Sequence, residues 1–288
     1  MRRLFVLACL LATAAPASAA PTITAHRGGA LADGVPVAAE NTLPAFRRAA
    51  RHGWLLEFDV SLTKDRVPVV IHDDTLDRVS NCSGLVKERT AAQLRAECWV
   101  DVIGAAGATA PNPRHTPIPT LAEVLRLAAR RRATISPEIK NIPPTSAQEL
   151  TGPDDFDPDP GGFATTVSRA LADSGFPQDR MIVQSFWPPN LDVARTYLPG
   201  AQLSFLTLEQ LNDPGPEVAF ARGYGWVSPG FTGPLHPAYV ERAHAYGERV
   251  TVYTPDSREE LEAALASGAD AVITDDPVLA EDLFNKGV

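Results

Sequence analysis

The stretch LLEFDVSLTKDRVPVVIHDDTLDR, residues 55–78, decides the fold and carries the first candidate site residues. Its opening part, residues 55–63, predicts a strand in which Glu57 and Asp59 stand two positions apart. Because side chains two positions apart in a strand point to the same side, both carboxylates project together while their apolar neighbours face the other way. After a short turn, residues 67–71 predict a second apolar strand. The stretch therefore predicts a hairpin with two carboxylates on one side of its first strand.

The paired carboxylates indicate a bound cation. A solvated strand face is the ordinary explanation for two acidic residues at this spacing. The strongly apolar neighbours of Glu57 and Asp59 predict a buried strand instead. Buried like charges need protons or a cation to offset their loss of hydration, and a hard divalent metal is the simplest cation for paired oxygen ligands.

The N-terminus has the pattern of a secretory signal peptide. The chain starts with MRR and continues with the apolar run LFVLACLLATAAPASAA, which ends in small residues and predicts cleavage after Ala19. A buried N-terminal helix is the alternative, and the run is too short to span a bilayer. We therefore expect residues 1–19 to be removed and residues 20–288 to form a secreted or periplasmic domain without a stable membrane anchor.

Length and net charge restrict the fold size and the kinds of partner that we expect for this chain. Its 288 residues suit one large α/β domain or two small ones, and the net charge is −9. Removing Arg2 and Arg3 with the signal peptide makes the mature chain more acidic still. An acidic surface repels nucleic acid and anionic lipid, so neither is an expected partner.

Two cysteines, Cys82 and Cys98, lie outside the signal peptide. In an exported protein a lone pair of cysteines most simply forms a disulfide. Two free buried thiols are the alternative, which the weakly apolar segment between them disfavours.

Short apolar strands alternate with helices along most of the remaining chain. The predicted strands outside the hairpin are residues 22–25, 133–139, 181–186, 201–206, 225–228, 250–253 and 271–274, and the predicted helices are residues 42–52, 120–132, 163–173, 191–197, 237–246, 258–266 and 278–284. This alternation predicts a parallel sheet, and nine strands including the hairpin fit a (β/α)₈ TIM barrel with one extra strand. A doubly wound open sheet is the alternative, but no G-x-G-x-x-G motif opens a helix.

Residues 75–117 interrupt the alternation. They are polar and glycine-rich, include both cysteines, and predict only one short helix, residues 91–97. We interpret them as a small insertion that caps the barrel.

Polar residues gather at the ends of the predicted strands. They are His26, Arg27, Glu57, Asp59, His72, Glu138 and Lys140. In a barrel the C-terminal strand ends form the face that carries the chemistry. Three carboxylates suit Ca²⁺ or Mg²⁺, the two cations suit phosphate oxygens, and two imidazoles supply an acid and a base near neutral pH. Without a serine elbow or a Cys–His pair, the set indicates metal-assisted cleavage of a phosphate ester.

Motifs along nearly the whole mature chain resemble those of the glycerophosphodiester phosphodiesterase family. They are HRGG (26–29), AENTLPAF (39–46), EFDVSLTKD (57–65), VVIHDDTLDR (69–78), IPTLAEVL (118–125), PEIK (137–140), VQSF (183–186), VTVYTPD (250–256) and GADAVITDDP (268–277). The resemblance implies a TIM barrel with a small insertion after the second catalytic histidine. It also implies hydrolysis of glycerophosphodiesters to glycerol 3-phosphate and an alcohol.

The resemblance also implies a role for each site residue. His26 and His72 take the acid–base roles, Glu57, Asp59 and Glu138 bind the metal, Arg27 and Lys140 hold phosphate, Glu40 lies near the metal or the glycerol, and Tyr253 lines the alcohol pocket where many relatives have Trp. We favour Ca²⁺ over Mg²⁺, because an exported protein meets more Ca²⁺ and three carboxylates suit its flexible coordination shell.

Two other functions are compatible with this type of barrel. One is phospholipase D-type cleavage of lysophospholipid or sphingomyelin, by a related group that lacks the full insertion. The other is a catalytically silent barrel that only binds phosphodiesters or a protein, which would be expected to lose a histidine or a metal carboxylate. For the favoured activity we expect the glycerol 2-hydroxyl to attack phosphorus, with His26 as the base and His72 as the acid.

Overall fold

The fold is seen in a computed structural model. It describes residues 20–105, 107–141, 162–208, 213–231 and 236–286. The predicted signal peptide, residues 1–19, lies outside this part of the chain. Within it, no helix combines the length and the apolar character needed to cross a bilayer.

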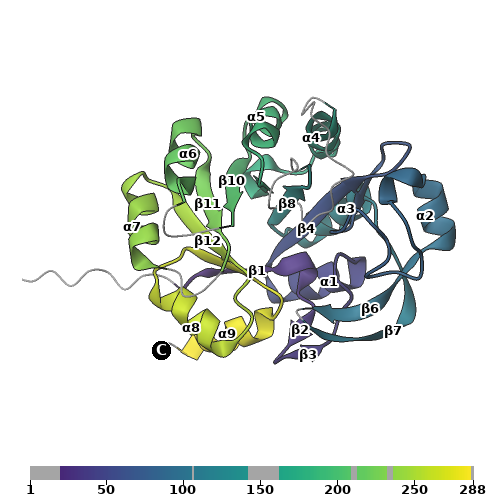
Figure 1. The fold of residues 1–288 in the computed structure, drawn as a ribbon, viewed down its shortest axis with the longest axis horizontal. Helices are drawn as coiled ribbons and strands as arrows, with labels where there is room; N and C mark the ends of the chain where they lie inside the picture. Colours follow the sequence, from purple (N-terminus) through teal and green to yellow (C-terminus); the bar gives the residue numbers. More distant parts are fainter. Residues whose placement is uncertain (1–19, 106, 142–161, 209–212, 232–235, 287–288) are drawn as a thin grey trace, which may run out of the picture.

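Eight parallel strands close into a barrel with helices around the outside (Figure 1). The barrel strands are β1 (Thr22–Ala25), β4 (Leu55–Leu62), β8 (Ile135–Ile139), β9 (Ile182–Ser185), β10 (Gln202–Thr207), β11 (Gly225–Pro229), β12 (Arg249–Tyr253) and β13 (Ala271–Thr274). Closure occurs at β1, where Thr24 lies opposite Ile273 of β13 and also opposite Leu55 of β4. The predicted TIM barrel is confirmed, and the open-sheet alternative is excluded.

One helix follows each barrel strand, directly or after an insertion. The helices are α1 (Leu43–His52), α3 (Leu121–Arg131), α4 (Phe163–Asp173), α5 (Pro188–Tyr197), α6 (Gly215–Arg222), α7 (Pro237–Ala245), α8 (Arg258–Ala266) and α9 (Pro277–Lys286). α3 starts at a capping box, in which Glu123 N donates to Thr120 Oγ1 and Thr120 N donates to the Glu123 carboxylate. α6 was not predicted, because it opens with Gly-Pro and buries only three of its residues.

Apolar packing lies between the strands and the helices, whereas the barrel interior is polar. On β4, Leu56, Phe58 and Val60 belong to the main core, so Glu57 and Asp59 occupy the opposite side. Towards the N-terminal strand ends the interior contains a cavity of about 330 Å³. Small polar residues from successive strands line it, among them Thr24, Ser136, Gln184, Ser204, Ser228 and Thr251. The barrel strands therefore depend on their outer faces for apolar burial.

The central stretch forms the predicted hairpin, and its second strand lies outside the barrel. β5 (Pro68–Val70) runs antiparallel to the end of β4, with Val60 opposite Val70. Ile71 N donates to Asp59 O at 3.1 Å. His72 therefore returns to the level of Asp59 just after the second arm of the hairpin, which is the extra strand that was predicted.

Residues 75–117 fold around a second, smaller apolar core beside the barrel (Figure 1). This insertion core includes Leu76, Val79, Val86, Leu94, Cys98, Val100 and Ile118. The predicted helix is present as α2 (Ala91–Glu97). The hairpin of β6 (Trp99–Ala105) and β7 (Ala108–Pro117) was not predicted, because β7 contains three prolines and is mostly exposed.

The predicted disulfide between Cys82 and Cys98 is present in the insertion. Cys98 is 3% exposed within the insertion core, whereas Cys82 lies in a surface loop. The bond thus ties the loop to the buried end of α2.

Replacing both cysteines by serine, C82S/C98S, is expected to lower the free energy of unfolding by up to about 3 kcal/mol, because the bond restricts the unfolded chain. Urea denaturation of both proteins, with and without dithiothreitol, measures this loss. Reductant should reproduce it in the parent protein and leave the double variant unchanged. Two titratable thiols in the native, unreduced protein would contradict the pairing.

Candidate active site

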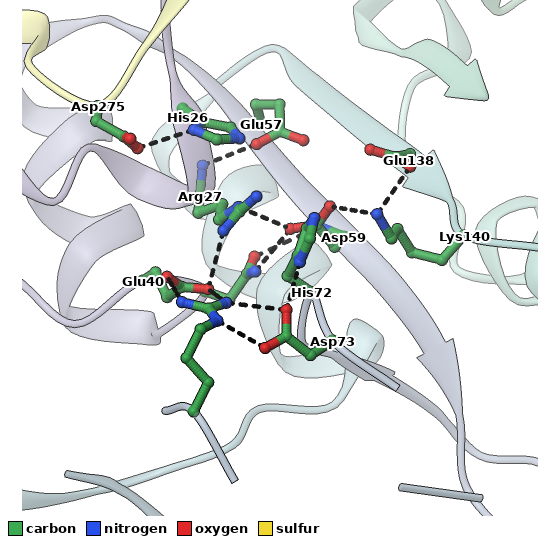
Figure 2. A network of polar contacts seen from close by, with 12 residues as sticks. His26, Arg27, Glu40, Glu57, Asp59, His72, Asp73, Glu138, Lys140 and Asp275 are labelled. Atoms are coloured by element: carbon green, nitrogen blue, oxygen red, sulfur yellow. Dashed lines mark hydrogen bonds and ion pairs between the residues drawn. The ribbon is translucent and has the colours of Figure 1, made fainter. Parts of the chain in front are cut away.

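The residues predicted from strand ends meet at one end of the barrel (Figure 2). His26 and Arg27 lie in a tight turn, His26–Gly28, that follows β1. Glu57 and Asp59 come from β4, and Glu138 comes from β8 in register with Asp59. Lys140 follows β8, while His72 and Glu40 approach from the hairpin and from the segment before α1. The fold therefore brings the predicted residues together, although they are far apart in the chain.

The turn after β1 contains three consecutive residues with positive φ. Arg27 has φ 50°, and Gly28 and Gly29 have φ 93° and 74°. A Cβ on Gly28 would lie 2.7 Å from the Cβ of Ala45, and one on Gly29 would lie 2.6 Å from Cγ of Pro277. Both glycines are therefore required by space as well as by conformation.

Three carboxylates converge between β4 and β8. Glu57, Asp59 and Glu138 each offer an oxygen within 4.8 Å of the others, and all three side chains are buried. Gln184 Nε2 donates to Glu57 Oε1 at 3.0 Å, and Asn41 Nδ2 donates to Asp59 Oδ2 at 2.8 Å. These amides hold the carboxylates in place without neutralising their charge.

Two cationic side chains border this cluster, but their charge does not balance that of the carboxylates. Lys140 Nζ lies 3.1 Å from Glu138 Oε1 and 3.8 Å from Asp59 Oδ1. Arg27 Nε lies 3.4 Å from Asp59 Oδ2, and its Nη1 lies 3.3 Å from Glu40 Oε1. Arg27 is thus shared with a fourth carboxylate.

Burial and the unbalanced negative charge of the cluster shift the pKa values of two of its carboxyls. Burial and the Asp59 carboxylate raise the pKa of Glu57 to about 8. Burial also raises the pKa of Glu138, although Lys140 opposes that shift. Near neutral pH the Glu57 carboxyl therefore keeps its proton unless a cation replaces it, and the pKa of Glu138 is shifted in the same direction. Three buried hard oxygen donors that need a cation fit Ca²⁺ or Mg²⁺, so this group could hold a divalent metal.

Each candidate catalytic histidine is paired with an aspartate. His26 Nδ1 lies 2.8 Å from Asp275 Oδ1, and His72 Nδ1 lies 2.6 Å from Asp73 Oδ1 (Figure 2). A carboxylate at Nδ1 fixes the orientation of the ring and leaves Nε2 for proton transfer.

The two pairs have opposite proton affinities. Burial disfavours the charged ring of His26, but the Asp275 carboxylate outweighs burial and raises the pKa to about 9. Burial, together with the Arg27 and Lys140 cations, lowers the pKa of His72 to about 4. At neutral pH one ring therefore carries a proton while the other can accept one.

Tyr253 lies at the C-terminal end of β12, on the same face of the barrel. Its hydroxyl donates to Thr207 O at 2.6 Å, and its ring packs edge-on against Phe186. Burial and the Glu138 carboxylate raise its pKa well above the usual value. The hydroxyl is thus already engaged with the backbone, which leaves the ring as the part that could contact a ligand.

Several residues of the network were not predicted from the sequence. They are Asn41, Asp73, Arg78, Gln184 and Asp275. Asp73 directly follows His72 and could have been suspected from that position. Asp275 could have been found only from barrel closure, which sets β13 beside β1.

A closed barrel whose C-terminal face joins two histidine–aspartate pairs to a buried carboxylate cluster is the arrangement expected of one class of protein, the barrel hydrolases of phosphate esters. The comparisons with known proteins are more specific. The glycerophosphoryl diester phosphodiesterase family matches residues 26–279. The chain therefore belongs to that family, as its motifs predicted.

Individual relatives agree with this assignment. A glycerophosphodiester phosphodiesterase of Caldanaerobacter subterraneus subsp. tengcongensis is 30% identical over 273 residues, 92% of this chain and 98% of that protein. Another from Bacillus altitudinis is 30% identical over 244 residues, 83% and 89% of the two chains. An Oleispira antarctica phosphodiesterase, solved in complex with the product sn-glycerol-3-phosphate, has the same fold, with a TM-score of 0.73, 22% identity and coverage of 93% and 98%.

Metal binding to Glu57, Asp59 and Glu138 is expected to release protons and to raise the melting temperature. Because protons compete with the metal at Glu57, the apparent affinity should increase as the pH rises towards about 8. Calorimetric titration of metal-stripped protein with CaCl₂ or MgCl₂, in buffers of different ionisation enthalpy, measures affinity and proton release together.

Asp59→Asn should abolish the binding heat, and Glu248→Gln serves as the control. Glu248 is a buried carboxyl that precedes β12, at the other end of the barrel. If neither CaCl₂ nor MgCl₂ changes the melting temperature of the metal-stripped protein, the site is ruled out.

Proposed function

We propose that this protein hydrolyses glycerophosphodiesters to glycerol 3-phosphate and an alcohol, using His26 and His72 as acid and base beside a divalent metal. The observation that carries the proposal is the pair of histidines with opposite proton affinities next to three buried carboxylates. Family membership and the activity for which the two relatives that are 30% identical are named support the substrate class. The folded insertion and the complete set of site residues disfavour the phospholipase D-type and non-catalytic alternatives.

The proton affinities favour a definite order of roles. His26 holds a proton at neutral pH and would donate it as the acid, whereas neutral His72 would accept one as the base. This order is the reverse of the one that we expected from the sequence.

The substrate brings its own nucleophile. His72 takes the proton of the glycerol 2-hydroxyl, whose oxygen then bonds to phosphorus as the bond from phosphorus to the alcohol oxygen breaks. His26 gives its proton to that departing oxygen, and a cyclic glycerol phosphate remains. In the second step His26 takes a proton from water, and the water oxygen bonds to phosphorus as the bond from phosphorus to the 2-oxygen breaks. His72 returns its proton to that 2-oxygen. Both rings thereby regain their starting states.

The cations of the site would bind the phosphate group. Arg27 and Lys140 border the carboxylate cluster, where a phosphoryl group in contact with the metal would also reach their N–H groups. Glu57, Asp59 and Glu138 would hold the metal, which when bound supplies positive charge for the phosphoryl oxygens. Ca²⁺ suits three carboxylates better than Mg²⁺ because its coordination shell is more flexible.

We also propose that the protein is exported. Residues 1–19 have the pattern of a signal peptide, and a disulfide persists mainly in oxidising compartments.

His26→Ala and His72→Ala are each expected to lower kcat by about 10²–10⁴-fold, as is typical for loss of an acid or a base. A glycerophosphodiester with a p-nitrophenol leaving group separates the two roles, because this phenol departs without a proton. Within a single turnover, in which p-nitrophenol release reports the first step alone, His26→Ala should recover much of its rate, whereas His72→Ala should not. His244→Ala, at an exposed histidine of α7, is the control. Recovery by His72→Ala alone would reverse the assignment.

A diester that lacks the glycerol 2-hydroxyl is expected to bind without being hydrolysed. Competition against the parent substrate measures binding, and phosphorus NMR measures both turnover and the cyclic intermediate. Rapid hydrolysis of this 2-deoxy analogue would show that water attacks directly and would eliminate the cyclic route.

A further inference from the structure

Arg78 lies in a turn at the start of the insertion and contacts two carboxylates of the site network. Its Nη1 and Nη2 donate to the two carboxylate oxygens of Glu40 at 2.8 and 2.7 Å. Its Nε and Nη2 donate to the two oxygens of Asp73 at 2.6 and 3.1 Å. One guanidinium thus makes two bidentate contacts, the geometry in which arginine binds carboxylates most strongly.

Each of these carboxylates holds a residue to which the proposed function gives a role. Asp73 pairs with Nδ1 of His72, and Glu40 pairs with Nη1 of Arg27. Figure 2 shows Glu40 and Asp73 together on one side of the site, below Arg27 and His72. Arg78 therefore connects the partner of the proposed base with the partner of the proposed phosphate ligand.

The insertion fixes the position of Arg78. Its neighbours Leu76 and Val79 are 0% and 3% exposed in the insertion core. Asp101 N on β6 donates to Val79 O at 3.0 Å, which attaches the turn to the hairpin of the insertion. The guanidinium extends from this anchored turn to the site, and the side chain remains 47% exposed.

We propose that Arg78 is a positioning residue, through which the insertion sets the orientation of the His72 ring and of the Arg27 guanidinium. The inference rests on the proposed function for the roles of His72 and Arg27. Arg78 itself need not touch the substrate, because the two carboxylates already occupy four of its five N–H donors. Asp73 alone could rotate about its side-chain bonds, and the bidentate contact to Arg78 restricts that rotation.

The test compares Arg78→Ala with Arg89→Ala. Arg89 is a matched control, because it lies in the same insertion and pairs with Glu97, outside the site network. We expect Arg78→Ala to lower kcat by roughly 10–100-fold, the usual range for partners that orient a ligand or a catalytic group, with little change in KM. Arg89→Ala should keep the parent kcat.

Two further measurements separate positioning from a loss of stability. Guanidinium ion added to Arg78→Ala should restore part of kcat, whereas Arg78→Lys should remain impaired because an ammonium group cannot make two bidentate contacts. The downfield proton NMR signal of the His72 ring N–H can be assigned by its loss in His72→Gln. It should broaden or shift in Arg78→Ala but not in Arg89→Ala.

The NMR signal does not depend on turnover, so it decides the inference even if the parent protein fails to hydrolyse glycerophosphodiesters. An unchanged kcat, an unchanged signal, or equal losses of activity and melting temperature in both alanine variants without rescue would each overturn the proposal.

Discussion

The burial of three carboxylates beside one another is the constraint on which the rest of the site depends. Ionised groups are costly to remove from water, and like charges at short range add to that cost. Lys140 and Arg27 offset part of the charge, and burial together with the remaining charge raises the pKa of Glu57 and of Glu138. Arg27 also pairs with Glu40, and Glu40 pairs with Arg78. The network thus extends outward to Arg78, which is half-exposed and can be solvated by water.

The same principle explains why two similar histidine–aspartate pairs differ. Among the charges that act on His26, the Asp275 carboxylate has the largest effect, and it outweighs burial. Asp73 divides its charge between His72 and Arg78, and His72 is subject to burial and to two cations of the site. A carboxylate partner alone therefore does not determine the protonation state of an imidazole, because burial and the charges beyond that carboxylate also act on it.

Features with a local cause were predicted from the sequence. The shared side of Glu57 and Asp59, the helix that begins near Thr120 and the pairing of Cys82 with Cys98 depend on rules that act over short distances or on the presence of a single cysteine pair. Repeated apolar strands were enough to predict the barrel, because alternation with helices permits few architectures.

Features that depend on closure or on exposed surface were not predicted. Asp275 reaches His26 across 249 positions, and no local pattern marks such a partner. β7 has no apolar alternation because it buries little, so its only sequence signal was its prolines, which argue against a strand. Arg78 ends the motif of residues 69–78, but its role depends on Glu40 and Asp73, which only the fold places beside it.

The polar cavity inside the barrel bears on the dielectric environment of the site. Gln184 lines this cavity and also donates to Glu57, so a single amide separates the carboxylate cluster from the hollow behind it. A space of about 330 Å³ that is lined in part by hydroxyl groups has room for several water molecules. The carboxylate cluster is thus linked through one amide to a space that water can occupy. Water dipoles in that space would reorient when charge shifts during a reaction, which an aliphatic barrel interior could not do.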